Sequence, residues 1–263
     1  MDKPIGTKGT YIIISPQMKD TQRAKYLCEK FTPAEEDTAR DCERPFLRLD
    51  CDGLSLCLGD QSIKGDFTRL IPRLKAGLSN ELIVRAAKIK NHEGQLFAID
   101  ATAGLGEDSF FLAASGLYVT LYEKNPVIFE LLQDALIRAL QSGLSDIVGR
   151  MNAVCADSIE EMNGTSLSPD VILLDPMFPQ RQKSALVKKK LQMIQKLESP
   201  CQNEKELLLS AVSADPKKLI IKRPPKGPYL AGIKPDHSIE GKAVRFDCFV
   251  SPRDRIDKFK AIP

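Results

Sequence analysis

The stretch 96–114 reads LFAIDATAGLGEDSFFLAA. Its first five residues form an apolar run that ends in Asp100 and predicts a short buried strand, whereas residues 108–114 predict a helix. Gly104 and Gly106 lie between the two, and they allow a tight turn in which the backbone can approach a ligand closely. A strand, a glycine turn and a helix in this order are typical of nucleotide-binding α/β folds.

The alternation of strands and helices continues along the chain. Further apolar segments predict strands at 118–123, 151–155, 171–175, 218–222 and 245–250. Helices are predicted at 80–89 with Ser79 as N-cap, at 126–142, at 158–162 and, as one or two helices, within 191–213. Apolar strands that alternate with helices indicate a Rossmann-like parallel sheet covered on both faces, with ligands bound at the carboxyl ends of the strands.

The first 75 residues have a different pattern. Short strands are predicted at 11–15, 46–50 and 54–58, with the turn signal Asp52-Gly53 between the last two, and a helix is predicted at 21–30 from Thr21. We therefore expect a small N-terminal α+β subdomain over residues 1–75, followed by a Rossmann-like α/β domain over residues 76–263.

Composition limits the classes of protein to consider. The 263 residues carry 38 Lys and Arg against 35 Asp and Glu, so any basic surface must be local. No apolar run approaches the roughly 20 residues of a membrane span, and no signal peptide is recognisable. The seven Cys form no C-x-x-C pair and only two His are present, which argues against a zinc site or a disulfide framework. We expect a cytoplasmic protein without a metal and without a membrane partner.

The acids of the first turn indicate the kind of cofactor. Glu107 and Asp108 follow Gly106 directly and would repel a pyrophosphate, but they would not repel a sulfonium cofactor that carries a free ammonium group. The dinucleotide fingerprint requires a third glycine where Ser109 stands. These residues favour S-adenosylmethionine (SAM) over NAD, although a structural turn without a ligand is the alternative.

Polar residues also follow the next two predicted strands. Glu123 ends the second strand, where an acid can accept hydrogen bonds from both ribose hydroxyls of an adenosine, and Lys124 beside it either flanks the adenine or faces water. Asp157 and Ser158 follow the third strand and are candidates for binding the adenine base. The alternative for Asp157 is that it caps the short helix after it.

The segment Asp175-Pro-Met-Phe-Pro179 follows the fourth strand and resembles the Asp/Asn-Pro-Pro-aromatic motif of amino-group methyltransferases. The lone pair of a base amine is delocalised into the ring, and hydrogen bonds from its N–H groups to a carboxylate and a main-chain carbonyl favour a more tetrahedral, nucleophilic nitrogen. Pro176 fixes φ and can aim such a carbonyl, and Phe178 can stack on a flipped base. We take Asp175, Pro176 and Phe178 as the catalytic candidates, against the alternative of a proline-bounded strand end with a buried Phe.

A local run of basic residues follows this motif. Residues 180–196 contain no acid, and together with the end of the fifth strand they supply candidates for contacts with RNA phosphates. These candidates are Arg181, Lys183, Lys188, Lys189, Lys222 and Arg223. A solvated helix face is an equally good interpretation of such a charge run.

Three segments together resemble the RsmJ family, bacterial guanine-N2 methyltransferases of small-subunit ribosomal RNA. They are 100–106 (DATAGLG), 175–179 (DPMFP) and 182–189 (QKSALVKK). The resemblance covers about residues 63–249 and implies a SAM-dependent methyltransferase fold, with a guanine 2-amino target near the 3′ end of that RNA. It implies cofactor contacts at Glu107, Asp108, Glu123, Lys124, Asp157, Ser158 and Asp175.

This sequence departs from the family pattern at two of those positions. The family commonly has Arg where Glu107 stands and where Lys124 stands, so a backbone contact is the safer expectation at residue 107. Met177, in contrast, replaces the second Pro of most amine methyltransferases and is itself a mark of the family.

Other functions stay open at this point. The motif alone also suits methylation of another RNA base, of DNA adenine or of protein glutamine. A dinucleotide-dependent oxidoreductase and a non-catalytic RNA-binding module are further alternatives. The substrate partner is expected to be the ribosomal RNA or the assembled small subunit, and the sequence does not fix the oligomeric state.

Overall fold

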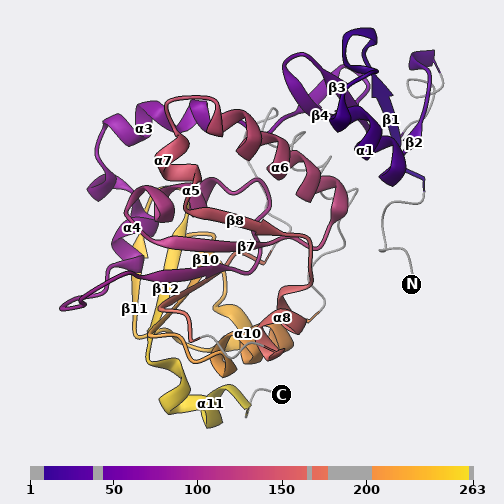
Figure 1. Ribbon diagram of the computed structural model, residues 1–263. Coiled ribbons are helices and arrows are strands. Elements are labelled where there is room, and N and C mark those ends of the chain that lie inside the picture. Colours follow the sequence, from indigo (N-terminus) through magenta and orange to yellow (C-terminus); the bar gives the residue numbers. More distant parts are fainter. Residues whose placement is uncertain (1–8, 38–43, 165–167, 177–202, 261–263) are drawn as a thin grey trace.

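The computed structural model describes residues 9–37, 44–164, 168–176 and 203–260. These residues form a sheet of five strands and a sheet of seven strands, each with its own helices. The smaller sheet lies at one end of the molecule beside helix α6 (Pro126–Leu140) (Figure 1). This division confirms the expected α/β domain with a small N-terminal appendage.

The large sheet has the strand order β11-β12-β10-β9-β6-β7-β8. Its five parallel strands are β6 (Phe97–Asp100), β7 (Tyr118–Tyr122), β8 (Met151–Val154), β9 (Val171–Leu174) and β10 (Lys218–Arg223). The order reverses between β6 and β9, which is the switch point where α/β sheets bind ligands. Strand β12 (Arg245–Val250) runs antiparallel to β10. Strand β11 (His237–Glu240), which the sequence did not predict, pairs with β12 at the edge.

Helices cover both faces of this sheet, because alternate side chains of each strand point to opposite sides. On one face pack α4 (Leu82–Ala87), α5 (Glu107–Ala114), α6 and α7 (Ser145–Val148). On the other face pack α8 (Ser158–Gly164), α10 (Glu204–Ser213) and α11 (Ile256–Lys260). Every predicted strand of this domain is therefore confirmed, with ends shifted by at most one residue.

The N-terminal unit is a mixed sheet in the order β2-β1-β3-β4-β5. The strands are β1 (Tyr11–Ile14), β2 (Thr32–Pro33), β3 (Phe46–Asp50), β4 (Gly53–Leu58) and β5 (Gln61–Ile63). Helix α1 (Gln22–Lys30) packs on it, and the hydroxyl of Thr21 caps α1 by accepting from the backbone N–H of Ala24 at 3.1 Å. The predicted helix start at Thr21 is thus confirmed.

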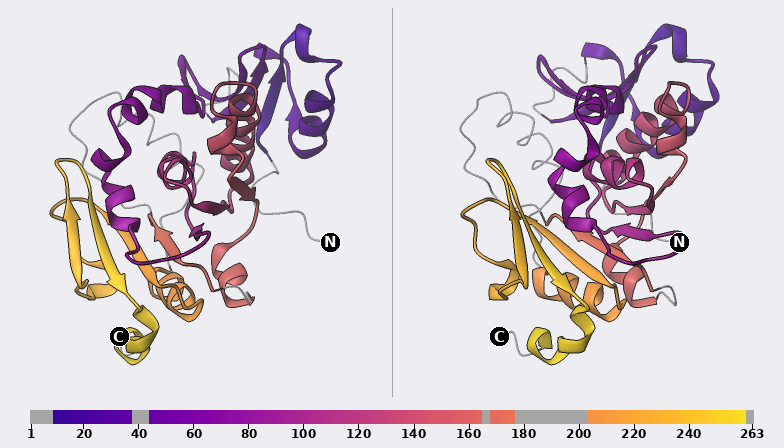
Figure 2. Two further views of the ribbon diagram at one scale, coloured as in Figure 1. Left: turned by 60° about the vertical axis from the view of Figure 1, so that its left-hand side comes forward. Right: turned by 90° about the vertical axis from the view of Figure 1, so that its left-hand side faces the viewer.

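Helix α6 contributes side chains to the hydrophobic cores of both sheets. Val127 and Leu131 pack among the leucines of the N-terminal unit, whereas Leu132 and Ala135 pack under the large sheet. The two views of Figure 2 agree that the N-terminal unit lies next to α6 and far from α10 and α11.

The expected boundary at residue 75 divides a segment that packs with the large domain. The short 3-10 helix Phe67–Leu70 precedes α3 (Ile71–Lys75), and both Phe67 and Leu70 are buried in the core of the large sheet. These contacts argue for a boundary nearer Gly65.

Two helix predictions differ from the structure. Ser79 is not the N-cap of α4, because residues 78–80 form a separate 3-10 turn and α4 begins at Leu82 after Glu81. Of the region 191–213, the described part contains α10, and residues 191–202 lie outside the described residues.

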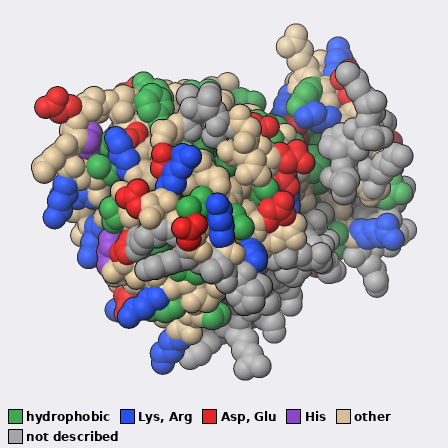
Figure 3. Space-filling view, turned by 90° about the horizontal axis from the view of Figure 1, so that it is seen from below, with side chains coloured by type: hydrophobic (Ala, Val, Ile, Leu, Met, Phe, Trp, Pro, Cys, Tyr) green, Lys and Arg blue, Asp and Glu red, His purple; other side chains and the backbone are tan. Residues whose placement is uncertain are grey.

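Figure 3 shows one face of the molecule, seen from below. On it, the Lys and Arg side chains of the described residues lie scattered among acidic ones. Among the described residues, no helix combines the length and apolar character needed to cross a bilayer.

Candidate active site

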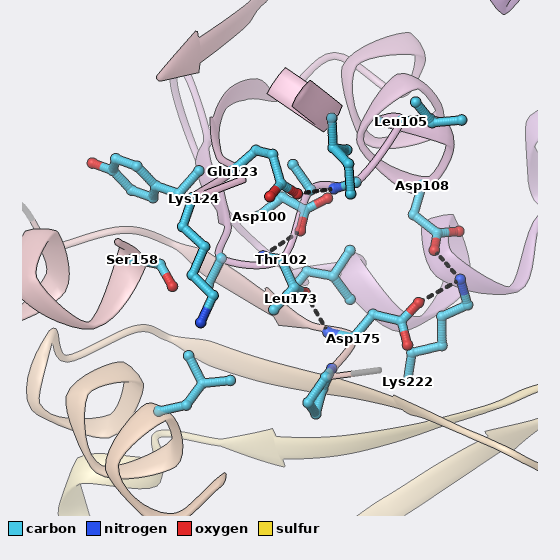
Figure 4. Close-up of a pocket in the computed structure, with 18 of the residues that line it drawn as sticks. Asp100, Thr102, Leu105, Asp108, Glu123, Lys124, Ser158, Leu173, Asp175 and Lys222 are labelled. Carbon is cyan, nitrogen blue, oxygen red and sulfur yellow. Dashed lines mark hydrogen bonds and ion pairs between the residues drawn. The ribbon is translucent and has the colours of Figure 1, made fainter. Parts of the chain in front are cut away.

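A cavity of about 520 Å³ opens at the carboxyl ends of β6, β7, β8 and β9, where the fold predicts a ligand (Figure 4). Its size suits a cofactor or a small ligand. The predicted cofactor residues Asp100, Gly104, Gly106, Glu107, Asp108, Glu123, Lys124, Asp157, Ser158 and Asp175 all line it, and so does Pro176. Residues as far apart in sequence as Asp100 and Lys222 therefore meet in one pocket.

The glycine turn after β6 forms one wall. Gly104 and Gly106 both have positive φ, +55° and +76°, which other residues rarely adopt. A side chain at Gly106 would also place its Cβ 2.9 Å from Cδ1 of Leu132 on α6. The turn is therefore tight enough to bring the first turn of α5 to the pocket.

Asp100 supports this turn from inside. It is 3% exposed, and its two carboxylate oxygens accept from the Ser109 hydroxyl at 2.6 Å and from the backbone N–H of Thr102 at 3.1 Å. Burial raises the pKa of Asp100 to about 7, although both hydrogen bonds act in the opposite direction. The role of Ser109 was missed, since the sequence shows only that it replaces a glycine.

Glu123 connects the ends of β6 and β7. Its carboxylate accepts from the backbone N–H of Gly104 at 3.0 Å and from that of Asn125 at 2.7 Å. Asn125 in turn caps α6 by accepting from Val127. The buried carboxylate is thus fixed on the pocket wall, while Lys124 beside it is exposed.

The third side of the pocket comes from the loop after β8. Asp157 caps α8 by accepting from the backbone N–H of Ile159 at 2.9 Å, which is the role that the sequence left as an alternative. Ser158 is buried, and apolar side chains of Ile128, Ile159 and Leu207 also line the cavity. An apolar wall next to polar groups is suited to binding a planar base.

Asp175 follows β9 directly and lies next to the glycine turn after β6. Its backbone N–H donates to the Thr102 hydroxyl at 2.6 Å, and its half-buried carboxylate faces the cavity. Lys222 at the end of β10 lies 2.9 Å from Asp175 Oδ2 and 2.6 Å from Asp108 Oδ2. One ammonium group therefore joins the carboxylates of two other elements (Figure 4).

This cluster shifts the proton affinity of its members. Burial raises the pKa of Asp175, and the neighbouring ammonium of Lys222 opposes that rise. Burial alone would lower the pKa of Lys222, but Asp108 and Asp175 outweigh burial and raise it above its ordinary value. Lys222 is consequently a fixed cation in the pocket at all physiological pH values.

The expected RNA-binding roles of Lys222 and Arg223 stay predictions, but both side chains already have partners within the domain. Lys222 is held by two carboxylates inside the pocket, and Arg223 is 2% exposed with its Nε donating to the carbonyl of Pro228 at 2.8 Å. Lys222 therefore points into the pocket, whereas Arg223 is packed inside the domain. The candidates Phe178, Arg181, Lys183, Lys188 and Lys189 lie outside the described residues.

The charges of the lining fit SAM better than a dinucleotide. Six carboxyl groups and two lysines line the cavity: Asp100, Glu107, Asp108, Glu123, Asp157, Asp175, Lys124 and Lys222. A pyrophosphate would meet several of these carboxylates, whereas the ammonium and sulfonium groups of SAM would be attracted. Glu123 lies on one wall of this cavity, and Glu107 and Asp108 lie in the first turn of α5.

Comparisons with known proteins agree with a pocket that binds SAM. The family model SAM_MT, which describes SAM-dependent methyltransferases, matches residues 44–251. A crystal structure of a SAM-dependent methyltransferase from Neisseria gonorrhoeae is similar with a TM-score of 0.71 at 31% identity, covering 92% of this chain and 96% of that one.

Two curated relatives carry the name ribosomal RNA small subunit methyltransferase J. The protein of Thioalkalivibrio sulfidiphilus is 40% identical over 215 residues, which is 78% of this chain and 84% of the relative. That of Marinobacter nauticus is 40% identical over 179 residues, 67% of this chain but only 64% of the relative's length. The chain therefore belongs to the ribosomal RNA small subunit methyltransferase J family of SAM-dependent methyltransferases.

Proposed function

We propose that the chain transfers the methyl group of SAM to the exocyclic 2-amino group of a guanosine in small-subunit ribosomal RNA. The observation that carries the proposal is the carboxylate of Asp175 at the pocket, where Thr102 holds the backbone N–H of this residue and Lys222 holds its Oδ2. The curated relatives are named for small-subunit ribosomal RNA, and the family resemblance implies the guanine amine.

In this proposal, Asp175 accepts a hydrogen bond from the target amine and favours a nitrogen whose lone pair can attack. Pro176 fixes the backbone beside it, and Phe178 stacks on the base. SAM supplies an activated methyl group. Asp175 then accepts the proton that the nitrogen loses once the N–C bond has formed and the C–S bond has broken.

The remaining pocket residues hold the cofactor. Glu123 accepts hydrogen bonds from the ribose hydroxyls, in addition to the two backbone N–H groups that it already holds. Ser158 and Asp157 lie at the adenine, with Lys124 at its exposed side. Asp108 and the backbone of Glu107 face the methionine end, where the negative carboxylate attracts the ammonium group.

The RNA itself is bound, we propose, through the basic segment that follows the catalytic motif. Arg181, Lys183, Lys188 and Lys189 neutralise phosphates near the target nucleotide. Because its substrate would be ribosomal RNA or the assembled small subunit, the protein would act in the cytoplasm, without a metal.

Transfer of tritiated methyl groups tests this function. The acceptors are small subunits and naked ribosomal RNA from a strain that lacks the gene, with DNA and total protein as parallel acceptors. We expect label in small-subunit RNA, recovered as N2-methylguanosine after digestion. Label in another nucleoside, or equal label in DNA or protein, would contradict the proposal.

A further inference from the structure

We propose that Lys222 is a positioning residue for methyl transfer, which keeps Asp175 ionised and turns one defined oxygen of its carboxylate toward the substrate. This inference rests on the proposed role of Asp175. It assigns to Lys222 a function inside the pocket, in place of the RNA contact that the sequence suggested.

The ammonium of Lys222 is fixed by elements that are themselves rigid. Its strand β10 is central to the sheet, because it pairs with β9 on one side and with β12 on the other, where Lys222 lies opposite Phe246. The side chain is 25% exposed and reaches Asp175 at 2.9 Å and Asp108 at 2.6 Å. The position of the cation is therefore set by the sheet and by the start of α5 together.

These contacts give the two oxygens of Asp175 different roles. Lys222 pairs with Oδ2, and the backbone N–H of Asp175 is used by Thr102. Within the described part of the chain, Oδ1 has no hydrogen-bond partner. Oδ1 is therefore the oxygen that can accept a hydrogen bond from the target amine, and it can do so fully only while the carboxylate is ionised.

The surroundings of Asp175 would favour protonation if Lys222 were absent. Asp108 of α5 and Asp100 of β6 are negative neighbours that raise the proton affinity of the pocket, and Arg223 of β10 is a further cation that acts on Asp175. Arg73 of α3 acts on Asp108 but pairs with Glu81 at 2.6 Å. Lys222 is thus the cation in direct contact with the two carboxylates.

Lys222→Met removes the charge and keeps most of the apolar stem. The matched control is Lys218→Met, because Lys218 lies at the other end of the same strand and donates to the backbone carbonyls of Ala86 and Lys88, away from the pocket. Lys222→Arg tests whether the charge alone restores the function.

The first measurement follows the ¹³C carboxyl resonance of Asp175 with pH in aspartate-labelled protein, assigned by its loss in Asp175→Asn. We expect Lys222→Met to raise the titration midpoint by at least about one pH unit, since a contacting charge shifts a carboxylate pKa by about 1–3. Lys222→Arg should keep the midpoint near that of the wild type, and Lys218→Met should leave it unchanged. An unchanged midpoint in Lys222→Met would overturn the proposal.

The second measurement is the pH profile of methyl transfer. Lys222→Met should lose activity at pH values below the raised midpoint of Asp175 and regain part of it above that midpoint, where Asp175 ionises again. If Lys222 had only a structural role, Lys222→Met would lower the methyl-transfer rate by the same factor at every pH. That result would count against the inference.

Two further provisions separate a failure of this inference from a failure to fold and from a failure of the proposed function. If Lys222→Met does not fold, Lys222→Gln replaces it in the NMR experiment, where the midpoint of Asp175 should rise because the amide carries no charge. An unchanged midpoint in Lys222→Gln would also contradict the proposal. Because the NMR titration needs no substrate, a failure to methylate ribosomal RNA would reject the proposed function and leave the role of Lys222 to be decided by the titration.

Discussion

The same carboxylates that are candidates for binding the cofactor also hold the backbone of the pocket. Asp100 accepts from Thr102, Glu123 from Gly104 and Asp157 from Ile159, in each case from a backbone N–H group. Buried backbone donors need such partners, because leaving one unsatisfied costs about 1–3 kcal/mol. Alanine at any of these positions would therefore change the shape of the pocket together with its charge.

Asp100 provides a pH-dependent test at the residue scale. Its pKa of about 7 in the folded protein is above the value of about 3.9 in an unfolded chain, so the folded state binds this proton more tightly. The stability that the folded state gains from this tighter proton binding is fully present below about pH 4 and is lost as the pH rises toward 7. Asn at this position can still accept from Thr102 and can donate to Ser109.

We therefore expect Asp100→Asn to gain stability relative to the wild type between pH 4 and pH 8, by an amount on the order of a few kcal/mol. Urea unfolding of both proteins at a series of pH values measures the difference. A difference that stays constant with pH would show that Asp100 does not titrate in this range.

Gly106→Ala should destabilise the protein more than Gly104→Ala. Both substitutions place a side chain at positive φ, but only at Gly106 would the new Cβ come within 2.9 Å of Leu132, whereas nothing lies within 4 Å at Gly104. We expect an additional loss of about 1–3 kcal/mol for Gly106→Ala, the usual cost of overpacking. Thermal unfolding of the two variants decides this, and equal losses would contradict the expected close contact.

At the scale of elements, α6 is the structural link between the two sheets. It supplies side chains to both cores, and its Glu130 is fully buried against α1. The carboxylate lies 2.8 Å from Arg23 and 2.6 Å from Lys30, and Tyr26 donates to it at 2.9 Å. One buried charge therefore attaches α1 to the methyltransferase domain.

Glu130→Gln should weaken this attachment. The amide cannot neutralise Arg23 and Lys30, although both cations are partly exposed and regain some hydration. We expect a loss of about 2 kcal/mol in the free energy of unfolding, less than for a wholly buried pair. Limited proteolysis should cut the N-terminal unit sooner in the variant.

The control is Glu36→Gln, which removes the exposed ion pair between Glu36 and Arg48. Exposed pairs contribute about 0–1 kcal/mol, so this variant should behave nearly as the wild type does. Similar losses in the two variants would argue that Glu130 does not link the units.

Sequence patterns predicted the elements with periodic apolar residues best. The strand at 46–50 has the expected bounds, and α6 begins at Pro126 as predicted, because Asn125 caps it. The prediction was wrong at Ser79, because the 3-10 turn at 78–80 places the helix start beyond it. Strand β11 was missed because its residues, HSIE, are mostly polar and lie at the sheet edge.

At the scale of the whole molecule, the parallel sheet explains why part of the site could be predicted. Asp100 ends a strand, Glu123, Asp157 and Asp175 each follow one, and the carboxyl ends of parallel strands meet at one edge. The pairing of Lys222 with Asp108, 114 residues away, depends on side-chain packing and has no local signature. The same holds for the contact of Thr102 with Asp175.

Methyl transfer in this pocket is expected to depend on the carboxylate of Asp175. The most direct test compares wild type and Asp175→Ala in methyl transfer to small-subunit RNA, with the affinity for S-adenosylhomocysteine measured by calorimetry. We predict that the variant binds this product within a few-fold of the wild type but transfers methyl groups at least about 100-fold more slowly, as when one transition-state hydrogen bond is lost. Transfer by Asp175→Ala at close to the wild-type rate would show that this carboxylate takes no part in the reaction.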